Sequence, residues 1–253
     1  MNAFIPLLHR EISRMIHSSV MTIIIVLFLI MMGGLFFMDF FDTIQPLSMR
    51  SFFVKAPLLL AFFCPALTMG RIAGERQDGT LALLQTMPLQ TLHIVLAKFA
   101  ACLFLLIITL ACTLSYPATL ASLGPLDWGP VIGGYLALIS LGGGYIAIGL
   151  FTSALAKDQV IAILTAFFLC LCLSYVHHLA LNTSGLHAIF LQNLSASYHF
   201  ANISRGVLDA KDILYTLSLQ FLALTATIFV IDARRYPKKT LTSHTENNSK
   251  EQR

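Results

Sequence analysis

The sequence has few charged residues for its length. Of its 253 residues, 11% are charged and 57% are hydrophobic, whereas about 25% of the residues of a typical soluble protein are charged. This composition excludes an ordinary soluble enzyme and a disordered chain. The formal net charge of +4 is also too small to form the basic surface that binds nucleic acid. We therefore expect an integral membrane protein whose surroundings are membrane lipid, with no nucleic-acid partner.

The short motifs that mark common catalytic sites are also missing. No Gly-Lys-Ser or Gly-Lys-Thr step is present, so the chain has no P-loop for ATP, and neither H-E-x-x-H nor G-x-S-x-G occurs. The five cysteines lie in apolar runs, and their odd number argues against a disulfide framework. His177 and His178 are adjacent, and neighbouring side chains on a helix point apart, which favours packing over a role as haem or copper ligands. We predict no catalytic residue, no metal site and no cofactor on this chain.

Six apolar runs are long enough to cross a bilayer, which takes about 20 residues of helix. The fold class is therefore expected to be an all-α membrane protein with six transmembrane helices. The runs cover residues 20–38, 52–70, 94–119, 131–156, 159–181 and 213–231.

Basic residues indicate how the chain is oriented. If the N-terminus is inside, the cytoplasmic segments hold 12 of the 16 Lys and Arg residues and the external segments hold four. Cytoplasmic loops of membrane proteins are enriched in these residues. We expect a multi-pass protein of the plasma (inner) membrane with both termini in the cytoplasm.

The regions outside the spans differ in character. Residues 1–17 carry Phe4, Leu8 and Ile12 at helical spacing with Arg10 and Glu11 largely on the other side, which predicts an amphipathic helix in the cytoplasmic interface. A soluble segment is the alternative. Residues 18–232 form the six-helix domain, with a cytoplasmic loop at 71–93 and an outer loop at 182–212. Residues 233–253 are expected to be a basic and then disordered cytoplasmic tail.

The loop at 71–93 is the most informative segment. Asp78 and Gly79 interrupt the chain, and a short helix follows in which Leu81 and Leu84 share one face. Pro88 then leads back toward the third span. An exposed apolar face with charges beside it predicts a docking surface for a partner, and the alternative is a helix that rests on the membrane surface.

Small residues indicate where helices approach closely, because lipid gives no hydrophobic drive for helix association. Gly129 and Gly133 form a G-x-x-x-G motif, and Gly149 and Ser153 are a second small pair at the same spacing. We predict helix packing at these four positions. A role in gating is the alternative, since it calls for the same residues.

Three groups of residues resemble one transporter family. They are Glu75-Arg76-x-x-Gly79-Thr80-Leu81 with Leu83-Leu84, Pro88 and Lys98; Gly149-Leu-Phe-Thr-Ser153 with Lys157 and Gln159; and Ser197-Tyr-His199-Phe200 with Arg205-Gly206-Val207-Leu208-Asp209 and Asp212-x-x-Tyr215. In this order they resemble type-2 permease subunits of ATP-binding cassette (ABC) exporters. The resemblance is greatest to the branch of the gliding-motility and nitrous-oxide-reductase-maturation permeases. The sequence departs from the pattern at Ala82, where such permeases often carry an acid.

The resemblance implies a transporter permease that depends on other chains. It would pair with a second permease subunit, as a homo- or heterodimer, and separate ABC ATP-binding subunits would bind ATP and Mg. Residues of the 75–88 segment would form the coupling helix that docks on the ATPase, and short re-entrant helices would lie in the outer loop. An alternative is a membrane component of a copper or haem maturation complex. The docking residues are Glu75, Arg76, Gly79, Thr80, Leu81, Leu84 and Pro88, and the outer-loop motif is His199, Arg205, Gly206 and Asp209.

Overall fold

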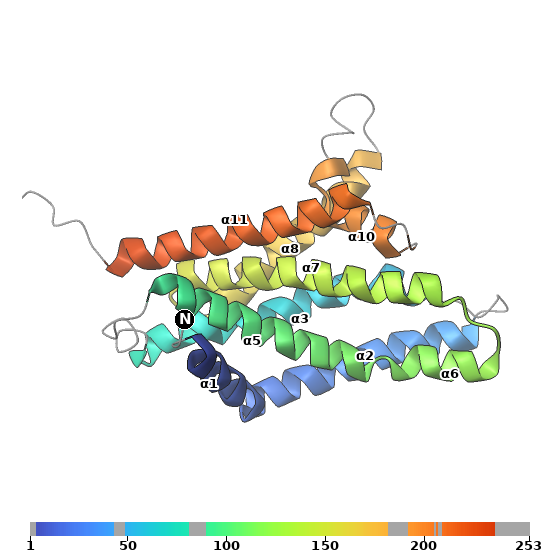
Figure 1. The fold of residues 1–253 in the computed structure, drawn as a ribbon, viewed down its shortest axis with the longest axis horizontal. Helices are drawn as coiled ribbons and strands as arrows, with labels where there is room; N and C mark the ends of the chain where they lie inside the picture. Colours follow the sequence, from blue (N-terminus) through green and yellow to red (C-terminus); the bar gives the residue numbers. More distant parts are fainter. Residues whose placement is uncertain are drawn as a thin grey trace, which may run out of the picture.

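The computed structural model describes residues 4–42, 49–80, 90–181, 192–204, 206 and 209–235, and its elements in these ranges are helices (Figure 1). Long helices run side by side along the molecule, and short ones lie at its two ends. The helices are α1 (Phe4–Ile16), α2 (Ser19–Asp42), α3 (Arg50–Gln77), α5 (Thr91–Cys112), α6 (Ser115–Leu123), α7 (Trp128–Leu155), α8 (Gln159–Leu181), α10 (Ala196–Ser204) and α11 (Ala210–Arg235).

Six stretches of these helices are long and apolar enough to cross a membrane, which confirms the predicted number of spans. The third stretch joins α5 and α6 across a turn at Thr113 and Leu114. The second runs on to Gln77, so residues 71–77 continue α3, although the sequence suggested that the loop begins at residue 71. The polar end of α3 is therefore helical, and its side chains follow the spacing of that helix.

Helix α7 is the centre of the bundle. It packs against α3, α5, α8, α10 and α11, and most of its residues are buried. Helices α2, α8 and α11 are apolar over most of their surface and expose large side chains, as expected of helices that face lipid. The small side chains of α7 thus lie in the interior of the bundle.

Helix α1 crosses the bundle beside the first turns of α5 (Figure 1). Its buried side chains are Leu7, Glu11 and Met15, while Ile5 is 71% exposed. The prediction that Glu11 lies largely on the polar side of this helix is wrong, because residues spaced four apart share one face. The position of α1 in the membrane interface remains a prediction.

Helix α10 follows the outer-loop residues 182–191, which lie outside the described part of the chain. It packs against α7, α8 and α11 and buries His199 and Phe200. The segment before α11 therefore returns to the bundle. Whether it dips into the membrane, as the re-entrant interpretation holds, remains a prediction.

Candidate functional site

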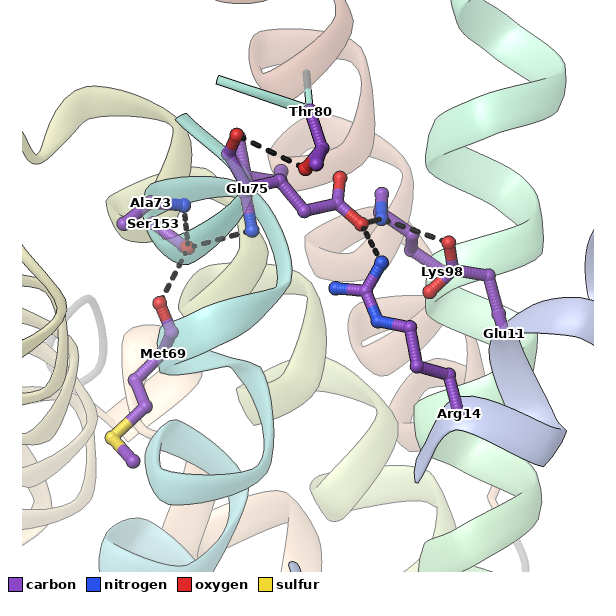
Figure 2. Close-up of polar contacts among 9 residues, drawn as sticks. Glu11, Arg14, Met69, Ala73, Glu75, Thr80, Lys98 and Ser153 are labelled. Atoms are coloured by element: carbon purple, nitrogen blue, oxygen red, sulfur yellow. Dashed lines mark hydrogen bonds and ion pairs between the residues drawn. The ribbon is translucent and has the colours of Figure 1, made fainter. Parts of the chain in front are cut away.

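The last turns of α3 hold a buried carboxylate that other charged side chains surround. Oε1 of Glu75 accepts hydrogen bonds from Lys98 Nζ and from Arg14 Nη1, each at 2.7 Å. The same ammonium reaches Glu11, with 3.1 Å between Lys98 Nζ and Glu11 Oε1. Figure 2 shows the four side chains converging from α1, α3 and α5. We call Glu11, Arg14, Glu75 and Lys98 the ion cluster, and the end of the bundle that holds it the Glu75 end.

The ion cluster is balanced in charge and nearly inaccessible to solvent. Two carboxylates face two cations, and Glu11, Glu75 and Lys98 are each exposed by 2% or less. Removing a charge from water costs several kcal/mol per ion in a protein interior, and a close partner of opposite sign offsets that cost. The side chain of Arg14 is 39% exposed, so solvent screens its attraction to Glu75. The buried Lys98 ammonium between two carboxylates is therefore the main electrostatic link among α1, α3 and α5.

Part of the ion cluster could be recognised from the spacing of residues along the chain. The resemblance places Glu75 among the docking residues, but its side chain points into the bundle and none of it is exposed. Glu11 shares the four-residue spacing of Leu7 and Met15, and this spacing places it on the buried face of α1. That periodicity could have marked Glu11 as buried, although nothing in it identifies Lys98 as the partner.

Arg76 and Gln77 attach the end of α3 to the turn between α7 and α8. The guanidinium of Arg76 donates to the carbonyls of Ala156 at 3.0 Å and Ala154 at 3.1 Å. The last carbonyls of a helix have no partner within it, so Arg76 satisfies carbonyl groups where α7 ends. Gln77 Nε2 donates to Asp158 Oδ1 at 2.7 Å. The position of α3 at the Glu75 end is thereby tied to that of α7.

Ser153 joins α7 to the backbone of α3 one turn further into the bundle. Its hydroxyl donates to the carbonyl of Met69 at 3.0 Å and accepts from the amides of Ala73 at 3.1 Å and Ile72 at 3.3 Å (Figure 2). A regular helix would pair the Ala73 amide with the Met69 carbonyl directly. The Ser153 hydroxyl lies between backbone amide and carbonyl groups of α3, and such groups need a hydrogen-bond partner when they are buried. Ser153 therefore holds α7 against α3.

Beyond α3 the chain turns into the segment that the sequence predicts to dock. Gly79 has φ of +71°, a conformation that glycine adopts without steric cost, and its amide donates to the carbonyl of Arg76 at 3.2 Å. The hydroxyl of Thr80 donates to the carbonyl of Glu75 at 3.3 Å. Leu81, Leu84 and Pro88 lie outside the described residues, so the docking helix itself remains a prediction.

The chain past this segment is also anchored. Thr91, which begins α5, donates from its hydroxyl to Asp232 Oδ1 of α11 at 2.5 Å. The segment 81–89 thus connects α3, which the ion cluster holds, to α5, which Thr91 holds against α11. A force on the segment would reach α1, α3, α5, α7 and α11 through these contacts.

The predicted packing residues differ in what they do. A Cβ built on Gly149 would lie 2.1 Å from Thr68 Oγ1 of α3, and one on Gly133 would lie 2.7 Å from the carbonyl oxygen of Ile203 in α10. Close approach therefore requires glycine at both positions. Gly129 is exposed, and a Cβ there would have only Asp127 Oδ1 of its own turn within 4 Å, at 3.4 Å.

The opposite end of the bundle, which we call the Asp212 end, holds a second buried polar group. Nδ1 of His199 lies 2.6 Å from Asp212 Oδ1, and Nε2 lies 3.0 Å from the carbonyl oxygen of Asn193. Each ring nitrogen thus has an oxygen atom within hydrogen-bond distance, and the donor and acceptor roles depend on the tautomer of the ring. It stacks on Tyr215 with 4.1 Å between ring centroids. His199 was predicted in the outer-loop motif, and its contact with Asp212 joins α10 to α11.

The rest of that motif is spread along the turn between α10 and α11. Gly206 has φ of +83° and packs near Gly129 and Gly133 of α7. Asp209 pairs with Lys211 at 3.0 Å at the surface, and the hydrogen bond from Lys211 lowers the pKa of the Asp209 carboxyl. Arg205 lies outside the described residues.

The described side chains suit a mechanical role better than a chemical one. Within the described ranges, no group of three or more His, Cys, Asp or Glu side chains is arranged to hold a metal ion. The clustered charges pair with one another and with backbone groups across helices. The site is therefore a junction between helices, next to the segment proposed to dock.

Comparison with known families agrees with this character. A family described as ABC2_membrane_2, ABC-2 family transporter protein, matches residues 5–205, a range that contains the ion cluster and runs from α1 through α10. No curated protein matches the chain.

Proposed function

Because the chain belongs to the ABC-2 family of transporter proteins, and is thus a membrane permease component of an ABC transporter, we propose that it couples ATP hydrolysis by separate ATP-binding subunits to export. Membrane subunits of this kind are not normally enzymes themselves, and an ATP-binding partner is general to such transporters. In our proposal ATP and Mg bind that partner, and both termini of this chain lie in the cytoplasm of a plasma (inner) membrane.

The observation that carries the proposal is the anchoring of the segment 81–89. On one side Glu75 and Arg76 fasten α3 to α1, α5 and α7, and on the other Thr91 fastens α5 to α11. A partner that binds the segment in two positions would favour two arrangements of these helices. The shift is limited by how differently the partner binds the two arrangements.

The assembly around the chain is also part of the proposal. A second permease subunit, identical or different, would complete the membrane domain, and one ATP-binding subunit would dock under each. We place the chain in the gliding-motility and nitrous-oxide-reductase-maturation branch on the motifs around Glu75, Gly149 and His199. If the purified complex retained an immature copper or haem enzyme, a maturation role would replace general export.

The docking surface is tested by replacing Leu81 and Leu84 together with Asp. We expect the tagged chain to insert normally in its host membrane and to lose the co-purifying ABC ATP-binding subunit, identified by mass spectrometry. Charged side chains on the docking face would carry a desolvation cost at an apolar interface.

The control is Leu123→Asp, an exposed position at the end of α6 on the far side of the bundle. This variant should retain the ATP-binding subunit at the level of the unaltered chain. Unchanged recovery in the Leu81 and Leu84 double variant would overturn the docking role of the segment.

A further inference from the structure

Arg71 of α3 is a buried cation that lies outside the ion cluster as defined above. It precedes Glu75 by four residues on the same helix, and it is 6% exposed. Among the described residues, its Nε and Nη1 atoms have no hydrogen-bond partner. A buried guanidinium with unpaired donors is costly, because burial removes the water that would otherwise bond to them. A carboxylate within reach of Arg71 would therefore stabilise it.

Glu75 has a carboxylate oxygen that could accept from Arg71. Its Oε1 atom accepts from both Lys98 and Arg14, each at 2.7 Å, whereas its Oε2 atom is buried and has no partner in the described part of the chain. Residues four apart on a helix are neighbours, with roughly 5–6 Å between their Cβ atoms. The long side chain of Arg71 can therefore reach Glu75 through a change of rotamer, without a shift of the α3 backbone.

The surroundings of Arg71 are shared with the ion cluster. Arg71, Lys98 and Glu11 all lie near enough to the buried Cys102 side chain of α5 for their charges to act on it. Lys98 and Cys102 are also four residues apart, so α3 presents Glu75 and Arg71 to one face of α5. Arg71 thus lies beside the ion cluster, and with it three cations accompany two carboxylates.

The ion pairs of α1 are the weaker ones in the cluster. The side chain of Arg14 is 39% exposed, so solvent screens its attraction to Glu75. Glu11 Oε1 lies 3.1 Å from Lys98 Nζ, whereas Glu75 Oε1 lies 2.7 Å from it. The pair between α3 and α5 is therefore the closest and most deeply buried one, and the two pairs that involve α1 are easier to break.

We propose that Arg71 is a second partner for Glu75 and that the ion cluster has two arrangements. In the observed arrangement, Arg14 pairs with Glu75 and holds α1 against α3. In the other, Arg71 replaces Arg14 at Glu75, Lys98 keeps its bond to Glu75, and α1 separates from the end of α3. The change is discrete because one carboxylate exchanges partners. This inference deepens the proposed coupling function and rests on it, since a partner that binds the segment 81–89 would favour one of the two arrangements.

The test measures how readily α1 opens, by hydrogen–deuterium exchange of its backbone amides in the full chain in phosphatidylcholine nanodiscs. Peptides of the buried helix α7 are the internal reference. Because Arg71 finds its partner only in the open arrangement, Arg71→Gln should slow the exchange of α1 several-fold relative to α7. Arg71→Lys keeps a cation four residues from Glu75 and should restore the rate. Lys157→Gln, which removes an exposed cation between α7 and α8, should leave the rate unchanged.

A second background separates an exchange of partners from a general effect of charge. In Arg14→Gln, Arg71 can pair with Glu75 in both arrangements, so it no longer favours the open one. Arg71→Gln should therefore leave the exchange of α1 unchanged in the Arg14→Gln chain. If the charge of Arg71 acted only at a distance, the substitution would slow α1 by the same factor in both backgrounds.

Four results would overturn the proposal. They are exchange of α1 that Arg71→Gln leaves unchanged, slowing by the same factor with and without Arg14, equal slowing of α1 and α7, and an Arg71→Lys chain that behaves like Arg71→Gln. The measurement requires no ATP-binding subunit. Failure of docking, which the Leu81 and Leu84 variant reports, is therefore distinguishable from failure of this exchange of partners.

Discussion

At the scale of single residues, the buried positive charge of Lys98 is compensated by two carboxylates that lie against it. Lys98 lies in a helix that is otherwise strongly apolar, and it is 1% exposed between Glu75 and Glu11. An unpaired ammonium there would be costly, because neither lipid nor a packed core hydrates it. Lys98, Glu75 and Glu11 therefore need one another to stay buried as charges. Because Glu11 belongs to α1, these ion pairs hold α1 against the bundle.

Glu75→Gln should destabilise the protein strongly. The change leaves Lys98 buried with only Glu11 as a charged partner, and breaking a buried ion pair by removing one member costs roughly 3–5 kcal/mol. We expect a clearly lower thermal unfolding midpoint in detergent, measured by loss of the monodisperse peak in size-exclusion chromatography.

Asp209→Asn is the matched control for that experiment. It also removes a carboxylate from an ion pair, but Asp209 and Lys211 are exposed at the surface. Exposed pairs contribute little, so the midpoint should not change measurably. Equal effects of the two substitutions would contradict the account of the ion cluster.

At the scale of elements, α7 organises the bundle through residues without large side chains. Gly142 meets Leu106 of α5, Gly149 meets Thr68 of α3, and Gly133 meets the backbone of α10. The helix remains continuous through Gly142, Gly143 and Gly144, so these glycines provide close approach rather than a break. This is the packing that small residues provide in a bilayer.

The two glycines of the G-x-x-x-G motif should respond differently to alanine. A methyl group at Gly133 would lie 2.7 Å from the carbonyl oxygen of Ile203, and backbone cannot move aside as a flexible side chain can. We expect Gly133→Ala to destabilise by about 1–3 kcal/mol, the usual cost of overpacking. The thermal unfolding midpoint in detergent provides the measurement.

Gly129→Ala should be neutral or slightly stabilising, because its Cβ would have only ordinary contact with Asp127 and alanine favours a helix. The pair tests the placement of α10 as well as the motif. If both substitutions had the same effect, the close approach of α10 to α7 would be in doubt.

At the scale of the whole molecule, the two ends of the bundle carry different features. The Glu75 end has the ion cluster, the Arg76 contacts and the segment proposed to dock, and the Asp212 end has the contact between His199 and Asp212. In the proposed function, the ATP-binding partner docks at the Glu75 end. Our orientation places the Glu75 end in the cytoplasm.

Labelling of single added cysteines tests this orientation. Asp78→Cys and Lys211→Cys both place a thiol at an exposed position, at the Glu75 end and the Asp212 end respectively. A membrane-impermeant maleimide applied to intact cells should label the second variant and leave the first at the level of the parent chain. Permeabilised cells should label both. Labelling of Asp78→Cys in intact cells would reverse the orientation and exclude docking on a cytoplasmic ATPase.

The amino-acid sequence by itself was sufficient for the number of spans and for the family resemblance. The cost of placing a residue in lipid depends on that residue and its near neighbours, so composition along the chain locates the helices. Gly79 could be recognised as a turn residue, and Gly133 and Gly149 as sites of close helix packing. The reason is similar, since residue type and local spacing along the chain identify turns and close contacts.

Only the tertiary structure decided which residues meet. Glu11 and Lys98 are 87 residues apart, and Arg76 reaches Ala156 across 80. Lipid is as apolar as the helices, so hydropathy does not determine which faces of the helices pack together. The pairing of α1 with α3 and α5 and the burial of Glu75 follow from that packing, which depends on the side chains of several helices at once.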